Sequence, residues 1–173
     1  MNTTLVLTVI GEDRPGLVES LSHVIAGHGG SWLESRMARL AGKFAGILRA
    51  SVPADQCETV TAELGRLEQR GLKVTIERSD ETEAPKTTRR LKLELIGDDH
   101  PGIVREIARA LAERGINVEE LHTELVSAPM SGDVLFKASA LLAAPASLSV
   151  DALRDKLEEL ANDLVVDVTL ADA

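Results

Sequence analysis

Apolar residues along the chain fall into short strand-like runs and into stretches with helical spacing. The run from residue 4 to 10 is rich in β-branched and aliphatic residues and ends at Gly11, which is typical of a strand. The apolar residues that follow have the spacing of one helix face: Leu17, Val18, Leu21, Val24 and Ile25. Pro15 suits the first turn of this helix, and Gly29 suits its end.

The rest of the first half predicts a hairpin, a second helix and a last strand. Two strands are expected at 31–40 and 43–52, because the short connection at residues 41–43 contains a glycine. A final strand is expected at 72–77. The second helix is predicted from apolar residues at helical spacing: Cys57, Val60, Leu64 and Leu67. The predicted order is therefore β-α-β-β-α-β.

The second half repeats this pattern at an offset of 86 residues, measured from Gly11 to Gly97. The same offset relates Asp13 to Asp99 and Pro15 to Pro101. Its predicted strands lie at 90–96, 116–126, 133–142 and 164–170. Its helices are predicted from two apolar sets: Ile103, Val104, Ile107, Ala110 and Leu111, then Val150, Leu153, Leu157 and Leu160. Such a period is too long for a solenoid and indicates a duplicated domain.

These elements predict an α+β protein of two ferredoxin-like βαββαβ domains. Each domain would have a four-stranded antiparallel sheet with two helices on one face. The domains are expected at 1–78 and 90–173, joined by a polar linker at 79–89 that contains a proline. Exposed sheet edges would need cover, which pairing of the two halves or of two chains in a homodimer could supply.

Composition indicates the kind of core and the cellular location to expect. Hydrophobic residues make up 44% of the chain, but two Phe, one Trp and no Tyr leave an aliphatic core. No apolar run approaches the roughly 20 residues of a membrane span. The N-terminus lacks the basic start of a secretory signal, and a single cysteine excludes an intramolecular disulfide framework. We therefore expect a cytoplasmic protein without a membrane association.

The charge balance argues against direct binding of nucleic acid. Asp and Glu outnumber Lys and Arg by 28 to 19, which gives a net charge of -9. Binding to a phosphate backbone depends on clustered basic side chains, and binding to single strands on aromatic ones. Both are scarce here, so any contact with DNA is expected to belong to a partner.

The duplicated motif Gly-x-Asp-x-Pro-Gly, between a strand and a helix, resembles that of the ACT domain. The resemblance implies a domain that senses amino acids or other small metabolites, commonly where two domains meet. A closer resemblance is to the glycine cleavage system transcriptional repressor group, which are tandem ACT proteins. It rests on four segments: 11–16 (GEDRPG), 36–40 (RMARL), 44–46 (FAG) and 128–132 (APMSG).

The motif has chemistry that suits a free amino acid. Backbone N–H groups at a helix start can bind a carboxylate, and Asp13 or Asp99 can pair with an ammonium group. Gly16 and Gly102 lack a Cβ and let a ligand approach the backbone. By resemblance, the polar residue that opens the second strand also contacts the ligand. The candidate ligand-binding residues are Asp13, Pro15, Gly16, Leu17, Val18 and Ser31 in the first half, and Asp99, His100, Pro101, Gly102, Ile103, Val104 and Asn117 in the second.

Of the two sites, the second is favoured, since Ser31 stands where the second copy has the expected Asn117. A simpler interpretation stays open for both copies. An aspartate before Pro-Gly at a helix start commonly caps the helix, worth roughly 0.5–2 kcal/mol without any ligand. The glycines would then serve only the turn.

Other reactive side chains give no sign of catalysis. Cys57 lies on an apolar helix stripe and is expected to be buried. The four histidines lack metal-ligand spacing, and no nucleophile elbow or phosphate loop is present. Neither a catalytic residue nor a cofactor or metal is therefore predicted.

The resulting hypothesis is a non-catalytic regulator that binds a small amino acid, glycine first, and modulates a protein partner. In the resembling group, that partner is a DNA-binding transcription factor of the glycine cleavage operon. The longer hairpin segment at 127–132 is a candidate partner surface, because loops often carry contacts. The alternative is a regulatory subunit of a separate enzyme of amino-acid metabolism.

Overall fold

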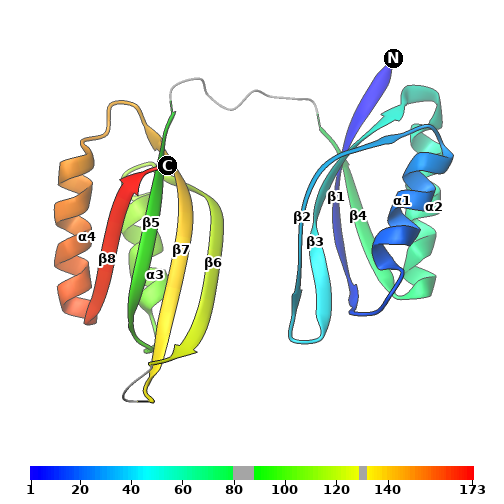
Figure 1. The fold of residues 1–173 in the computed structure, drawn as a ribbon. Helices are drawn as coiled ribbons and strands as arrows, with labels where there is room; N and C mark the ends of the chain where they lie inside the picture. The colour runs from blue at the N-terminus through cyan, green and yellow to red at the C-terminus, as the bar shows by residue number, and fades with distance from the viewer. Residues whose placement is uncertain (80–87, 129–131) are drawn as a thin grey trace. The chain divides into compact units, whose positions relative to one another are not determined.

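The computed structural model describes residues 1–79, 88–128 and 132–173. The chain divides into two compact units, Met1–Glu83 and Ala84–Ala173, which are shown in Figure 1. Most of the predicted linker, at 80–87, lies outside the described residues. Residues 129–131 of the longer hairpin segment do so as well.

The first unit has the predicted β-α-β-β-α-β order. Its elements are β1 (Asn2–Glu12), α1 (Leu17–Gly27), β2 (Ser31–Leu40), β3 (Lys43–Pro53), the 3-10 turn η1 (Ala54–Gln56), α2 (Cys57–Arg66), the 3-10 turn η2 (Leu67–Arg70) and β4 (Leu72–Arg78). The strands form one antiparallel sheet in the order β2-β3-β1-β4. Both helices cover the same face of this sheet (Figure 1).

The second unit repeats this architecture. Its elements are β5 (Thr88–Asp98), α3 (Ile103–Ala112), β6 (Asn117–Ser127), β7 (Val134–Pro145), α4 (Val150–Leu164) and β8 (Val166–Asp172). The sheet order β6-β7-β5-β8 matches that of the first unit, strand for strand. The α+β class and the ferredoxin-like fold of each unit are thus confirmed.

Each unit has an aliphatic core between its sheet and its helices. In β1, Leu5, Leu7 and Val9 are fully buried at alternating positions, because successive side chains of a strand point to opposite faces. Leu21 of α1 and Leu64 of α2 pack in the same cluster. Full burial of a Leu contributes about 1.5–3 kcal/mol relative to exposure, so these positions determine which sheet face the helices cover.

Two local predictions were wrong. The last strand, expected at 164–170, begins only at Val166, because α4 continues through Leu164 and Val165 takes a left-handed conformation (φ 55°). Pro15 was expected inside the first helical turn. Instead α1 begins at Leu17 with Gly16 as its N-cap, and the proline precedes the helix.

None of the helices within the described ranges combines the length and the apolar character that crossing a membrane requires.

Candidate functional site

The two motif loops are built alike, each between the first strand and the first helix of its unit. Gly16 and Gly102 are the N-cap residues of α1 and α3, and both have left-handed φ values of 91° and 102°. Residues with a Cβ rarely adopt this conformation, so the turn itself requires glycine. A Cβ built on Gly16 would find no heavy atom within 4 Å, so this side of the loop is also open.

The residue before each motif proline attaches the loop to the chain that precedes the last strand. In the first unit, Nη2 of Arg14 donates a hydrogen bond to the carbonyl oxygen of Arg70. In the second, Nε2 of His100 lies 2.9 Å from the carbonyl oxygen of Leu164 and donates to it. Different side chains therefore make the same contact, which fixes the loop against the start of the last strand.

The motif aspartates do not cap the helices, so the capping interpretation is wrong. No side-chain hydrogen bond caps either helix. Oδ2 of Asp13 instead lies 2.7 Å from Nε of Arg39 in an exposed ion pair. In the second unit, the residue at the position equivalent to Arg39, 86 residues later, is Leu125. The exposed Asp99 side chain has no hydrogen bond or ion pair to another described residue. Of the two carboxylates, Asp99 is therefore the one available to a cationic group.

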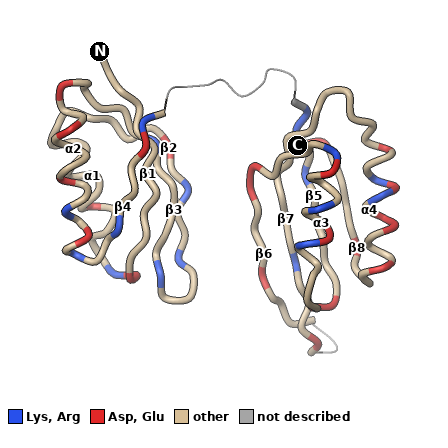
Figure 2. Tube along the Cα trace, turned by 180° about the vertical axis from the view of Figure 1, so that it is seen from behind, with Lys and Arg blue, Asp and Glu red and all other residues tan. Residues whose placement is uncertain are grey.

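A polar depression of about 450 Å³ lies at the motif loop of the first unit. It is lined by Arg14, Pro15, Gly16, Glu19, Ser20, Gln69 and Arg70. Figure 2 shows acidic and basic residues close together at this end of the first unit, where β1 ends. Positively and negatively charged side chains around one depression suit a zwitterion better than a simple anion.

The apolar residues predicted at the two sites differ in how far they are buried. Leu17 and Ile103 are buried in their cores, with 5% and 3% exposure, so only their backbone N–H groups can face a ligand. Val18 and Val104, one position further along each helix, are nearly half exposed. The first-turn N–H groups of a helix have no intrahelical partner, which leaves them available to a carboxylate.

The structure separates the strand-opening residues from the motif of their own unit. Ser31 pairs with Ser51 in the sheet, whereas Asp13 donates its N–H to Gly42 at the other end of β3. At about 3.3 Å per residue, the chain from Gly42 to Ser51 spans roughly 30 Å. Asn117 holds the corresponding place in β6. One glycine-sized ligand thus cannot contact the motif loop and the strand-opening residue of a single unit.

Sequence reasoning missed the partners of the motif. Arg39, Gln69 and Arg70 come from strand and turn segments far along the chain, and no local pattern links them to the motif. Gly71 is a turn signal before the last strand, but it gives no indication that Arg70 contacts Arg14.

Two reactive side chains outside the motif are buried or paired with other side chains. Cys57 is buried, with 3% exposure, as predicted. Nε2 of His28 lies 3.1 Å from a carboxylate oxygen of Glu63, which ties the end of α1 to α2. Among the described residues, no three or more His, Cys, Asp or Glu side chains are grouped so that they could hold a metal ion.

Comparison with protein families decides the identity of the first half. The model of the ACT domain matches residues 3–77, which span the first unit from β1 to β4. The first unit is an ACT domain. Because the second unit repeats its strand order and its motif loop, the chain has a tandem ACT-like architecture.

Solved structures share this tandem architecture. A Galdieria sulphuraria protein is 29% identical, with a TM-score of 0.89, and the match covers 100% of this chain and 99% of that one. A putative glycine cleavage system transcriptional repressor is 20% identical with a TM-score of 0.69, over 99% of this chain and 97% of its own. At 20% identity, the similarity to the putative repressor shows a shared fold and nothing more. No curated protein matches the chain.

Proposed function

We propose that this tandem ACT protein is a non-catalytic regulator that binds a small amino acid at the motif loop of its second unit. The observation that carries the proposal is the exposed Asp99 carboxylate, which has no partner among the described residues and lies three residues before Gly102, the N-cap of α3. The carboxylate would pair with the ligand ammonium. The N–H groups of Ile103 and Val104 would bind the ligand carboxylate, assisted by the helix dipole.

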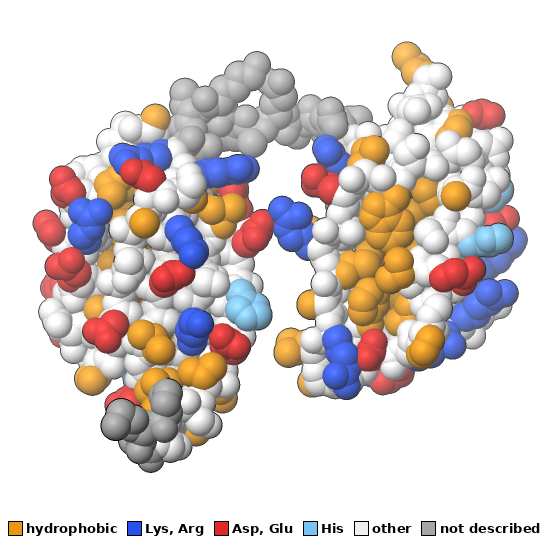
Figure 3. All heavy atoms as spheres, in the orientation of Figure 1, with side chains coloured by type: hydrophobic (Ala, Val, Ile, Leu, Met, Phe, Trp, Pro, Cys, Tyr) orange, Lys and Arg blue, Asp and Glu red, His pale blue; other side chains and the backbone are white. Residues whose placement is uncertain are grey.

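Glycine is the first candidate ligand, and the partner is proposed to be a DNA-binding regulator of glycine cleavage in the cytoplasm. The tandem fold shared with a putative repressor of that system supports this assignment. The net charge of -9, and the mixture of acidic and basic side chains on the face shown in Figure 3, favour a protein partner over direct DNA contact. A homodimer stays a prediction.

Regulation would work by linkage between two binding equilibria. An effector shifts partner binding only by the difference between its affinities for the free and the complexed regulator. Glycine is small, and the best tiny ligands gain about 1.5 kcal/mol per heavy atom. Its five heavy atoms allow about 7.5 kcal/mol, or a Kd of a few micromolar. A realistic Kd lies between tens of micromolar and millimolar.

The decisive experiment is a thermal-shift titration with each of the twenty amino acids up to millimolar concentrations. A ligand at about a hundred times its Kd stabilises the folded state by about 2.7 kcal/mol, and a ligand at a concentration equal to its Kd by about 0.4 kcal/mol, which is seen as a rise in Tm. We expect a selective shift with glycine or a close relative. Asp99→Ala should abolish it, whereas Asp13→Ala should retain it because Asp13 is already paired with Arg39.

Asp98→Ala is the matched control, since it removes the same charge one residue earlier, at the end of β5. It should leave the shift intact. If no amino acid raises Tm, or if Asp98→Ala and Asp99→Ala act alike, the amino-acid site is wrong. Purification of the tagged chain from its host, with and without glycine, then tests the partner. Recovery of the catalytic subunit of a metabolic enzyme would overturn the DNA-binding partner.

A further inference from the structure

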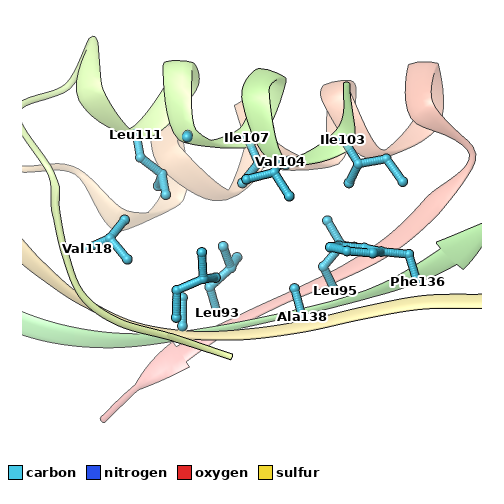
Figure 4. Close-up of a pocket in the computed structure, with 12 residues that line it drawn as sticks. Leu93, Leu95, Ile103, Val104, Ile107, Leu111, Val118, Phe136 and Ala138 are labelled. Carbon is cyan, nitrogen blue, oxygen red and sulfur yellow. The ribbon is translucent and has the colours of Figure 1, made fainter. Parts of the chain in front are cut away.

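The second unit contains an apolar cavity between α3 and its sheet. Its volume is about 50 Å³, and its lining is entirely apolar. In Figure 4, side chains of α3 point toward those of the strands across this space. Among the residues that line it are Ile107 of α3, Leu93 of β5, Val118 of β6 and Phe136 of β7.

Two of the side chains that line this cavity are smaller than their counterparts in the first unit. Trp32 in β2 corresponds to Val118 in β6, because each precedes a β-bulge and pairs with a fully buried residue of the next strand. Leu48 in β3 corresponds to Ala140 in β7, since they pair with Leu7 and Leu93 at the repeat offset.

Both first-unit residues contribute to its core. Leu48 is buried and Trp32 packs against the same cluster. Two side chains of the first unit are thus replaced by smaller ones in the second, whereas Ser35 and Gly46 are replaced by the larger Leu121 and Ala138. The cavity of the second unit is lined by the two smaller side chains, Val118 and Ala140.

The cavity is accessible from outside. Three of its lining residues are substantially exposed: Val104 by 46%, Val118 by 38% and Leu121 by 55%. A ligand could therefore reach it between α3 and β6 without unfolding the unit. Exposed Leu and Val around an apolar cavity would gain stability from burial against an apolar ligand.

We propose that this cavity is a binding site for a small, neutral aromatic ligand of about one ring. A charged or strongly hydrogen-bonding ligand is excluded, because the lining offers it no polar partner. An aromatic ring is favoured because the duplicate unit places an aromatic side chain at the same position. Dry apolar cavities of larger size, about 150 Å³, bind benzene, so a ring here would fill the cavity and extend into its mouth.

This site does not rest on the amino-acid site proposed above. It uses the side chains below α3, whereas the amino-acid site uses the Asp99 carboxylate and backbone N–H groups. Glycine should therefore leave it unaffected, and Asp99→Ala should not weaken it.

The test is a titration of the full chain with benzene and with toluene, followed by methyl NMR of its Ile, Leu and Val residues. We expect saturable shifts of the methyl groups of Ile107, Val118 and Leu121. Two variants fill the cavity with the residues of the first unit, Val118→Trp from the mouth and Ala140→Leu from the floor. Each should weaken binding at least tenfold.

Ala140→Leu leaves the mouth residues unchanged, so it decides the question if Val118→Trp fails to fold. Asp99→Ala is the control with an intact cavity and should bind both probes as the wild type does. Absence of saturable shifts up to the solubility of the probes would overturn the proposal. Equal binding by a folded filled variant would also overturn it, as would loss of binding in Asp99→Ala.

Discussion

Val165 shows how the two copies of the domain differ at the scale of a single residue. It lies between α4 and β8 with φ 55° and ψ 48°, a left-handed conformation that β-branched residues rarely adopt. The corresponding residue of the first unit is Gly71, with φ 78°. A left-handed conformation costs an L-residue with a Cβ roughly 1–2 kcal/mol. The second unit therefore carries strain that the first one avoids.

We expect Val165→Gly to raise the free energy of unfolding of the second unit by about 0.5–1 kcal/mol. The gain is smaller than the strain because glycine also increases the entropy of the unfolded chain. Urea unfolding followed by circular dichroism measures it. The reciprocal variant Gly71→Val should lower the stability of the first unit by about 1–2 kcal/mol. A Val165→Gly protein no more stable than the wild type would contradict the strain argument.

At the scale of elements, the periodic patterns predicted most of the fold. The strand at 31–40 was placed at its observed limits, because the short glycine-containing connection at 41–43 marks the hairpin that follows it. The α4–β8 boundary was misplaced, since Leu164 and Val165 resemble strand residues while the helix and a left-handed residue occupy them. The motif was found from the repeat, but Arg39 and Arg70 were not. Only the fold brings them to the loop, and no local pattern predicts a long-range contact.

The first glycine of the motif, Gly11, serves the packing of β1 against β4. A Cβ built there would lie 2.5 Å from the backbone oxygen of Gly71, so the two strands would have to move apart. We expect Gly11→Ala to destabilise the first unit by about 1–3 kcal/mol, the usual cost of overpacking. Urea denaturation of the full chain measures this change.

Gly65→Ala is the matched control for that substitution. Gly65 lies within α2, and a Cβ there would meet no heavy atom within 4 Å. Alanine favours a helix over glycine by about 1 kcal/mol, so this variant should be more stable than the wild type. If both glycine substitutions changed stability in the same direction, the close approach of β1 and β4 would not explain Gly11.

At the scale of the whole molecule, the chain has two hydrophobic cores that share no residue. Leu64 of α2 is fully buried in the first core, and Leu157 of α4 is buried in the second, with 1% exposure. Truncation of a buried Leu to Ala typically costs 2–5 kcal/mol, through lost burial and the cavity that remains. Because every contact removed lies within one core, the loss should be confined to one unit.

Hydrogen exchange of the full chain tests this separation. Leu64→Ala should accelerate the exchange of the slowest amides in β1, β3 and α2, and leave those of β5, β7 and α4 at their wild-type rates. Leu157→Ala should do the reverse. Regions that open independently exchange with their own free energies, whereas a single cooperative unit exchanges with one. Equal acceleration in both halves would mean that the duplicated domains fold as one unit. An effector bound to the second domain would then stabilise the first as well.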